Sequence, residues 1–194
     1  MPMFEAARAA TSPAIAADLA DLAERLRRVT VEVRGRNGFG SGVIWHSGGL
    51  IVTSAHVARG PASVALADGR VFDAHVLRWD AERDVAALRI AAEDLPAADV
   101  GESEALRVGE MVFAVGSPLG LTGALTAGII HAIGLRGRSR DRRWIVADLR
   151  LAPGNSGGPL ADARGRVVGI NGMIHGGLAL AVPSHAVMRF LDAP

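Results

Sequence analysis

The sequence predicts an all-β protein of two packed six-stranded antiparallel β-barrels, with an N-terminal helix and a short C-terminal helix. Short strand-like runs follow one another in two groups of about six, and no helical segments alternate with them, which argues against a parallel sheet. The 24 glycines among 194 residues suit the many turns of such a fold. Hydrophobic residues make up 49% of the chain and charged residues 21%, which is typical of a globular protein with a substantial core.

Residues 1–28 are predicted to form a tail and an amphipathic helix. Ser12 followed by Pro13 is typical of a helix start. Apolar residues then recur at spacings of four, three and four along one helical face: Ile15, Leu19, Leu22 and Leu26. This face either packs on the chain's own barrels or docks a regulatory partner or a second copy of the chain. The sequence leaves both alternatives open.

Residues 29–95 are predicted to form the first barrel. Valines alternate with polar residues from Val29 to Arg34, which is the period of two expected of a half-buried strand. Gly48-Gly49 and Asp68-Gly69 predict hairpin turns between later strands. Those strands are expected at residues 43–45, 50–53, 63–66, 71–77 and 85–90.

Residues 96–107 predict a connector, and residues 108–194 predict the second barrel and the C-terminal helix. Ser184 is expected to cap that helix, which would run through Leu191. The strands of the second barrel are expected at residues 111–115, 126–133, 144–148, 167–170 and 178–182.

The candidate nucleophile is Ser156, within the motif Gly154-Asn155-Ser156-Gly157-Gly158-Pro159. A serine hydroxyl is a weak nucleophile, so it needs a base beside it and hydrogen-bond donors for the developing oxyanion. The glycines allow a sharp turn that brings the N–H groups of Gly154 and Ser156 close to a substrate carbonyl. The same residue types also form ordinary turns. The interpretation therefore depends on whether the chain supplies a base and a carboxylate.

His56 and Asp84 are the candidate base and carboxylate. A lone histidine is more often structural, but His56 directly follows an apolar strand. Asp84 directly precedes another apolar run, where a desolvated carboxylate can hold an imidazole in one tautomer. Asp80 and Glu82 are instead expected in a solvated turn. The order His56, Asp84, Ser156 is that of chymotrypsin, and the three residues together predict a catalytic triad.

Several further motifs support this interpretation, because together they resemble the HtrA/Deg serine proteases. They are Gly40–Ile44, Thr53–Val57, Arg83–Leu88, Leu106–Glu110, Ala114–Gly120 and Pro153–Leu160. The resemblance covers about residues 29–191 and implies the chymotrypsin-like fold, with His56 and Asp84 on the first barrel and Ser156 on the second. It implies an ATP-independent endopeptidase without a cofactor that acts on a protein or peptide substrate. It also implies an oxyanion hole made by the backbone of Gly154, Asn155 and Ser156.

The chain departs from the family pattern in several places. The family usually carries C-terminal PDZ domains, whereas this sequence ends at Pro194, so a protease domain without PDZ-based substrate delivery is expected. Residues 13–28 match only loosely the segment that usually takes part in trimerisation. Asp148–Pro153 also differs from the run of small residues that usually precedes the serine motif in the family. Two other functions therefore stay open: a latent protease-fold binding or chaperone-like module, and a catalytic subunit activated by a partner.

Substrate specificity is predicted from the same resemblance. Leu151 and the strand of Leu178, Ala179, Leu180 and Ala181 are expected to line the specificity pocket, and the backbone of this strand is expected to pair with an extended substrate. No acid stands at the expected pocket base, which predicts cleavage after aliphatic residues rather than after Arg or Lys. If Arg150 or His175 approaches the pocket, the pocket would instead admit an acidic residue directly before the cleaved bond.

Asn155 bears on activation. In trypsin-like zymogens an aspartate at this position pairs with a newly cut N-terminus, and Asn155 cannot form that ion pair. No proteolytic activation step is therefore expected. Any control of activity is expected to act through a loop order–disorder transition.

The remaining features predict no nucleic-acid site, metal site or membrane span. The net charge is +1, and no aromatic platform accompanies the basic loop of Arg136, Arg138, Arg140, Arg142 and Arg143, so a solvated or regulatory loop is expected. The remaining histidines lack metal-binding spacing: His46, His75, His131, His175 and His185. No apolar run approaches the roughly 20 residues that span a bilayer. No leader is visible, so the chain as written is expected in the cytoplasm, whereas a removed leader would place it in the periplasm or outside the cell.

Overall fold

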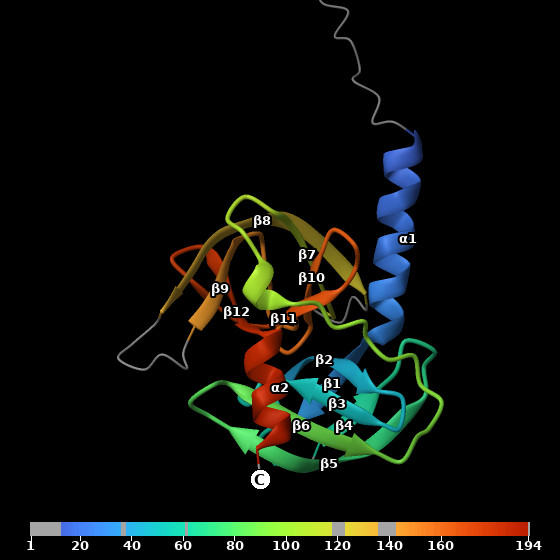
Figure 1. The fold of residues 1–194 in the computed structure, drawn as a ribbon. Coiled ribbons are helices and arrows are strands. Elements are labelled where there is room, and N and C mark those ends of the chain that lie inside the picture. Colours follow the sequence, from blue (N-terminus) through green and yellow to red (C-terminus); the bar gives the residue numbers. More distant parts are fainter. Residues whose placement is uncertain (1–12, 36–37, 61, 118–122, 136–142, 194) are drawn as a thin grey trace, which may run out of the picture.

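The strands close into two six-stranded antiparallel barrels, one above the other, as predicted (Figure 1). The computed structural model describes residues 13–35, 38–60, 62–117, 123–135 and 143–193. The predicted tail with Ser12, and Arg136, Arg138, Arg140 and Arg142 of the basic loop, lie outside these ranges.

The first barrel has the strand order β1-β2-β3-β6-β5-β4. Gly49 and Gly69, at φ values of +85° and +90°, lie at the two predicted hairpin turns, where this left-handed conformation favours glycine. The strands are β1 (Thr30–Gly35), β2 (Gly38–His46), β3 (Leu50–Thr53), β4 (Ala62–Ala65), β5 (Val71–Asp80) and β6 (Val85–Ile90).

The second barrel has the strand order β10-β11-β12-β9-β8-β7. One strand, β10 (Pro159–Asp162), was not predicted, because its first residues were assigned only to the serine motif. Proline is tolerated at the first position of a strand, and β10 pairs with β7 and β11. The other strands are β7 (Met111–Gly116), β8 (Ala124–Leu135), β9 (Arg143–Asp148), β11 (Val167–His175) and β12 (Leu178–Pro183).

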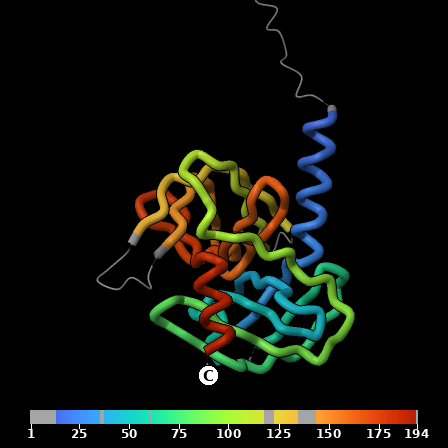
Figure 2. The backbone as a smooth tube through the Cα atoms, in the orientation of Figure 1, coloured from blue at the N-terminus to red at the C-terminus, as the bar shows by residue number. Residues whose placement is uncertain are grey.

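A hydrophobic core lies inside each barrel, and a third core joins the two barrels. In this third core Val43 and Val85 of the first barrel pack with Ile170 of the second barrel and with Phe190 of α2 (Ser184–Asp192). The connector also links the halves, since it carries the 3₁₀ helix Ser103–Ala105 across to the second barrel (Figure 2). The shared core and the connector therefore hold the two barrels against each other.

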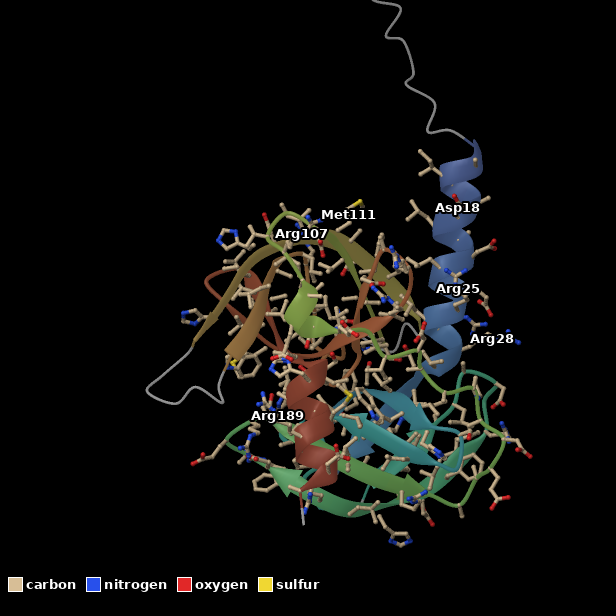
Figure 3. The ribbon with its side chains drawn as sticks, viewed as in Figure 1. Asp18, Arg25, Arg28, Arg107, Met111 and Arg189 are labelled. Atoms are coloured by element: carbon tan, nitrogen blue, oxygen red, sulfur yellow. The ribbon has the colours of Figure 1, made fainter. Side chains whose placement is uncertain are left out.

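The predicted N-terminal helix is α1 (Pro13–Val29), and only its second half packs on the barrels. Leu22 and Leu26 are buried against Phe113 and neighbouring residues of the second barrel. Ile15 and Leu19 are 54% and 38% exposed, and this half of α1 extends beyond the barrels (Figures 1 and 3).

The predicted role of Ser184 as a helix cap is wrong. The N-cap residue of α2 is Pro183, which makes no side-chain capping bond. Ser184 Oγ instead donates to the carbonyl of Gly101 at 2.7 Å and accepts from the N–H of Ser103 at 3.3 Å. The side chain is fully buried and links α2 to the connector. A buried hydroxyl needs hydrogen-bond partners, and the backbone groups of Gly101 and Ser103 supply them here.

Candidate active site

His56 lies in a helical turn directly after β3. The N–H groups of Val57 and Ala58 donate to the carbonyl of Ser54, which closes the turn. The Ser54 side chain is buried and donates to the carbonyl of Asn171 in the second barrel at 3.0 Å. The turn that presents His56 is therefore attached to the opposite wall of the cleft.

Asp84 contacts His56 through both carboxylate oxygens. Oδ1 lies 2.8 Å and Oδ2 3.0 Å from His56 Nδ1, and Oδ1 also accepts from the His56 backbone N–H at 3.1 Å. Asp84 is 7% exposed and has a φ of +54°, a conformation that Asp tolerates better than most residues. Its carboxylate fixes the imidazole orientation and favours a proton on Nδ1, so Nε2 is the nitrogen left to act as a base.

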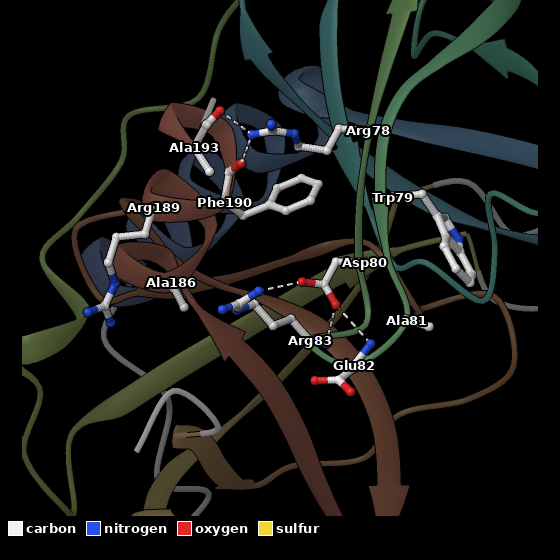
Figure 4. A pocket seen from close by; sticks show the side chains of 10 residues that line it. All are labelled: Arg78, Trp79, Asp80, Ala81, Glu82, Arg83, Ala186, Arg189, Phe190 and Ala193. Atoms are coloured by element: carbon white, nitrogen blue, oxygen red, sulfur yellow. Dashed lines mark hydrogen bonds and ion pairs between the residues drawn. The ribbon is translucent and has the colours of Figure 1, made fainter. Parts of the chain in front are cut away.

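Asp80, by contrast, stabilises the turn that leads to Asp84. Its carboxylate accepts from the N–H groups of Glu82 and Arg83 at 2.8 and 2.9 Å, and the Arg83 guanidinium donates to it (Figure 4). Burial acts to raise the pKa of Asp80, but these hydrogen bonds and the Arg83 charge outweigh it and lower the pKa overall. Arg78, from the same hairpin, donates to the carbonyls of Phe190 and Ala193 at the end of α2.

Ser156 lies on the second barrel and lines the same hollow as His56 and Asp84, of about 430 Å³. Its hydroxyl donates to the carbonyl of Gly172 at 2.9 Å. All of these residues belong to the described part of the chain, and no hydrogen bond joins Ser156 to His56 there. The structure thus brings the three predicted residues together but directs the serine hydroxyl toward Gly172.

The loop before Ser156 leaves two N–H groups available. Gly154 has a φ of +105°, and the Asn155 N–H closes the turn by donating to the carbonyl of Ala152 at 3.0 Å. Within the described residues, the N–H groups of Gly154 and Ser156 have no acceptor, which suits an oxyanion hole. The Asn155 N–H, which the resemblance had included, is not available because it closes the turn.

Ser41 of β2 joins the first barrel to both ends of this loop. Its Oγ donates to the carbonyl of Gly154 at 2.7 Å and accepts from the N–H of Ser117 at 3.0 Å. Its own N–H donates to the carbonyl of Ser156 at 2.8 Å, and its carbonyl accepts from Thr53 Oγ1 at 2.6 Å. Ser41 is fully buried, so these bonds are shielded from water. Sequence reasoning noted Ser41 within a motif but gave it no role.

The expected backbone pairing of β12 with substrate is wrong. The strand of Leu178, Ala179, Leu180 and Ala181 lies inside the barrel, paired with β11 on one edge and with β9 on the other. Its backbone groups are therefore already used. Leu151 is half-buried against the core of the second barrel, where a contribution to a specificity pocket is compatible with its position.

The end of β11 offers the open edge instead. β10 pairs with β11 only as far as Ile170, whereas β12 stays paired with β11 to His175, so no strand covers the other edge of β11 beyond Ile170. Gly172 lies at a bulge in this pairing, and Gly172 and Met173 line the hollow with Ser156. An extended peptide can add to such an edge as a further strand.

Arg150 and His175, which were predicted as possible partners of an acidic substrate residue, are both exposed. Arg150 makes no hydrogen bond or ion pair with the described residues. It directly precedes Leu151, the residue expected in the specificity pocket.

Comparison with known proteins agrees with this geometry. Residues 40–170 match the family described as "Trypsin-like peptidase domain". The chain belongs to the trypsin-like peptidase family. This trypsin-like peptidase is 41% identical over 156 residues to "Putative serine protease HhoB" of Synechocystis, and the match covers 75% of the chain and 38% of the relative. It is 42% identical over 167 residues to "Probable periplasmic serine endoprotease DegP-like" of Halomonas elongata, covering 81% of the chain and 35% of the relative.

A solved structure of an HtrA-type protease also matches the chain. The "HtrA-type protease AlgW with tripeptide" matches this peptidase with a TM-score of 0.83 and 33% identity, over 89% of the chain and 62% of that structure. The predicted resemblance to HtrA/Deg serine proteases is confirmed. The chain spans only 35–38% of the length of the two relatives above.

The remaining structural findings concern metals and membranes. Among the residues that the structure describes, no group of three or more potential ligand side chains could hold a metal ion. In the same part of the chain, neither helix is long and apolar enough to cross a bilayer.

Proposed function

We propose that this trypsin-like peptidase is a serine endopeptidase that cleaves protein or peptide substrates without ATP, through His56, Asp84 and Ser156. The observation that carries the proposal is the double contact of Asp84 with His56 Nδ1, at 2.8 and 3.0 Å, beside a serine in the same hollow. A carboxylate held in this way keeps the imidazole in the tautomer that a general base needs.

In the proposed reaction, Ser156 Oγ attacks the substrate carbonyl while His56 Nε2 accepts the hydroxyl proton. The N–H groups of Gly154 and Ser156 stabilise the oxyanion. His56 then gives the proton to the leaving amine, which departs as the acyl-enzyme forms. A water molecule attacks the acyl-enzyme and loses a proton to His56. His56 then gives this proton to Ser156 Oγ as the bond from Oγ to the acyl carbon breaks, which releases the acid product.

Substrate binding would also redirect the serine hydroxyl. We expect an extended substrate to add to the edge of β11 that β10 leaves uncovered, and to donate a backbone N–H to the Gly172 carbonyl, which now accepts the Ser156 hydroxyl. The freed hydroxyl can then rotate about Cα–Cβ toward His56. Catalytic hydrogen bonds that are missing in a free enzyme often form only in the substrate complex.

For specificity we propose small or medium aliphatic residues before the cleaved bond, held by Leu151. The alternative is an acidic residue at this position, which the free cation of Arg150 favours. Profiling on a peptide library separates the two, and cleavage mainly after Arg or Lys would contradict both.

A second candidate is a latent protease-fold binding module, which the absence of a Ser156–His56 hydrogen bond favours. In this case the protein would still bind a protein or peptide, while Ser156 stays unreactive toward it. A third candidate is control by a regulatory partner or a second copy at α1, which the exposure of Ile15 and Leu19 favours. Removing residues 1–21 tests this candidate without removing buried Leu22 and Leu26; an unchanged rate would exclude control by the exposed half of α1.

The decisive experiment is labelling of the purified protein with a fluorophosphonate probe, with Ser156→Ala as the control. We expect labelling of the wild type and none of the variant. Ser184→Ala is a second control, because it removes a buried serine hydroxyl at the connector instead. Labelling that persists in Ser156→Ala would exclude this serine as the nucleophile, and no labelling of the wild type would favour the latent module.

The compartment is a separate proposal. The description of the Halomonas elongata relative as periplasmic favours a site outside the cytoplasm. Cell fractionation with an antibody against the protein tests this proposal, and recovery in the cytoplasmic fraction alone would contradict it.

A further inference from the structure

The buried carboxylate of Asp84 has hydrogen-bond partners on one residue only. It accepts from the His56 backbone N–H and contacts His56 Nδ1, and no other residue in the described part of the chain donates to it. Asp84 is nevertheless only 7% exposed. A buried carboxylate normally has several donors, because its removal from water is costly. The groups that surround the rest of this carboxylate therefore decide how firmly it holds His56.

Gly172 lies beside the carboxylate. A Cβ added to Gly172 would lie 3.2 Å from Asp84 Oδ2, and 3.0 and 3.3 Å from Cζ3 and Cη2 of Trp144. The φ of Gly172 is not in the left-handed region that favours glycine, so its close neighbours, rather than its backbone, require the missing side chain. The carboxylate oxygen and the edge of the indole thus approach the same face of Gly172.

Trp144 belongs to β9 and is 8% exposed in the core that joins the two barrels. The same core contains Val85, the residue directly after Asp84. Trp144 is not among the described residues that line the hollow of Ser156, so a substrate in this hollow would not touch the indole. Any effect of Trp144 on catalysis therefore passes through Gly172 and Asp84.

We infer that Trp144 is a positioning residue for the proposed reaction, because its indole covers Asp84 Oδ2 beside Gly172 and keeps water from it. A water molecule there would donate to Oδ2 and compete with His56 Nδ1, and in a wetter site the charge of Asp84 would act less strongly on the imidazole. Gly172 is the second part of the arrangement, since a side chain would separate the ring from the carboxylate. The inference rests on the proposed function for its effect on rate, and on geometry alone for the exclusion of water.

Trp144→Phe shortens the ring and opens this space. We expect kcat for a peptide substrate to fall about tenfold with KM unchanged, since small displacements of catalytic groups have effects of this order. Phe190→Leu is the matched control, because Phe190 is 6% exposed in the same core but is not among the nearest neighbours of a Cβ at Gly172. Both variants are expected to lower the melting temperature, and only Trp144→Phe is expected to lower kcat.

Gly172→Ala tests the second part of the arrangement. Its methyl group would press on both the indole and the carboxylate, so one of them must move and kcat is expected to fall. In Trp144→Phe the shorter ring leaves room for this methyl group, which then fills the opened space. The double variant is therefore expected to have a higher kcat than Trp144→Phe alone, whereas independent effects would multiply.

A second measurement does not depend on catalysis. In Ser156→Ala, ¹H NMR follows the proton on His56 Nδ1, which is expected to give a sharp low-field signal because Asp84 holds it away from water. Adding Trp144→Phe is expected to broaden this signal to loss through exchange with water, and adding Phe190→Leu is not. If melting curves show that Trp144→Phe fails to fold, Gly172→Ala replaces it, because it also displaces the ring or the carboxylate.

The outcomes separate the two proposals. Failure of the wild type to react with the fluorophosphonate would contradict the proposed function, and the NMR signal would still decide the role of Trp144. Three results would overturn the inference: a signal already lost in Ser156→Ala alone, equal signals after Trp144→Phe and Phe190→Leu, or losses of kcat that multiply in the double variant.

Discussion

Replacing Ser41 with alanine tests whether the first barrel positions the candidate oxyanion hole. The Oγ of Ser41 holds the carbonyl of Gly154, and the N–H of Gly154 is one of the two available donors in the loop. Ser41→Ala removes this bond and also leaves the N–H of Ser117 without its acceptor. The loop then loses the contact that fixes the Gly154 peptide, although His56, Asp84 and Ser156 are unchanged.

The size of the effect follows from these two bonds. Ser41 is fully buried, so each backbone group left without a partner costs about 1–3 kcal/mol, or roughly 2–6 kcal/mol of unfolding free energy together. For a chain of this length that corresponds to a melting temperature lower by about 10 °C. Complete loss of an oxyanion donor costs about 100-fold or more in kcat, so a partly displaced Gly154 is expected to cost about 10–100-fold, with KM little changed.

Ser184→Ala is the matched control. Ser184 is also fully buried, and its Oγ also donates to a glycine carbonyl at 2.7 Å and accepts from a serine N–H, but at the connector. We expect both variants to lose similar stability, whereas only Ser41→Ala loses kcat and fluorophosphonate labelling rate well below its melting temperature. Equal losses of activity in the two variants, or full activity in Ser41→Ala, would refute the reasoning.

Three further predictions test other parts of the structure. Asp84→Asn is expected to lower kcat about a thousandfold or more, because the His56 tautomer is no longer fixed; steady-state kinetics with a near-normal rate would exclude the proposed role. The ionised Asp80 stabilises the fold above about pH 3.9, and this contribution disappears as the pH falls through its lowered pKa. Asp80→Asn is therefore expected to lower the melting temperature at pH 7 more than at pH 3, and an equal difference would contradict this. Leu26 is 1% exposed, so Leu26→Ala is expected to lower the unfolding free energy by about 2–5 kcal/mol in denaturant titrations. Leu19→Ala is expected to lower it by less than about 0.5 kcal/mol. Similar losses in the two variants would mean that the first half of α1 is also buried.

The fold was predictable because its signals are local. Alternating valines mark β1, and the hairpin turns at Gly49 and Gly69 lie where the sequence placed them. The strand β10 was missed because its proline and glycine-rich start resembles a turn. The choice of Asp84 over Asp80 also followed from a local signal, the apolar run directly after Asp84, and the structure brings its carboxylate to His56.

The missed features depend on contacts between distant segments. Ser41 and Gly154 are 113 residues apart, and nothing near Ser41 in the sequence indicates which carbonyl its hydroxyl reaches. Trp79 likewise received no role, because nothing near it in the sequence indicates that its indole reaches the carbonyl of Ala55. The cap assigned to Ser184 failed for the same reason, since a distant carbonyl at Gly101 competes for the hydroxyl.

The error over the substrate-binding strand shows this limit most clearly. Both β11 and β12 are short apolar strands, and the sequence of neither says which of its edges is free. Only the pairing of β12 with β9 and the early end of β10 leave one edge of β11 uncovered by a strand beyond Ile170, next to Ser156. A substrate added at that edge would meet Gly172, whose carbonyl holds the serine hydroxyl in the free protein. The bulge at Gly172 thus links substrate pairing to the release of the nucleophile, a relation that exists only in the folded chain.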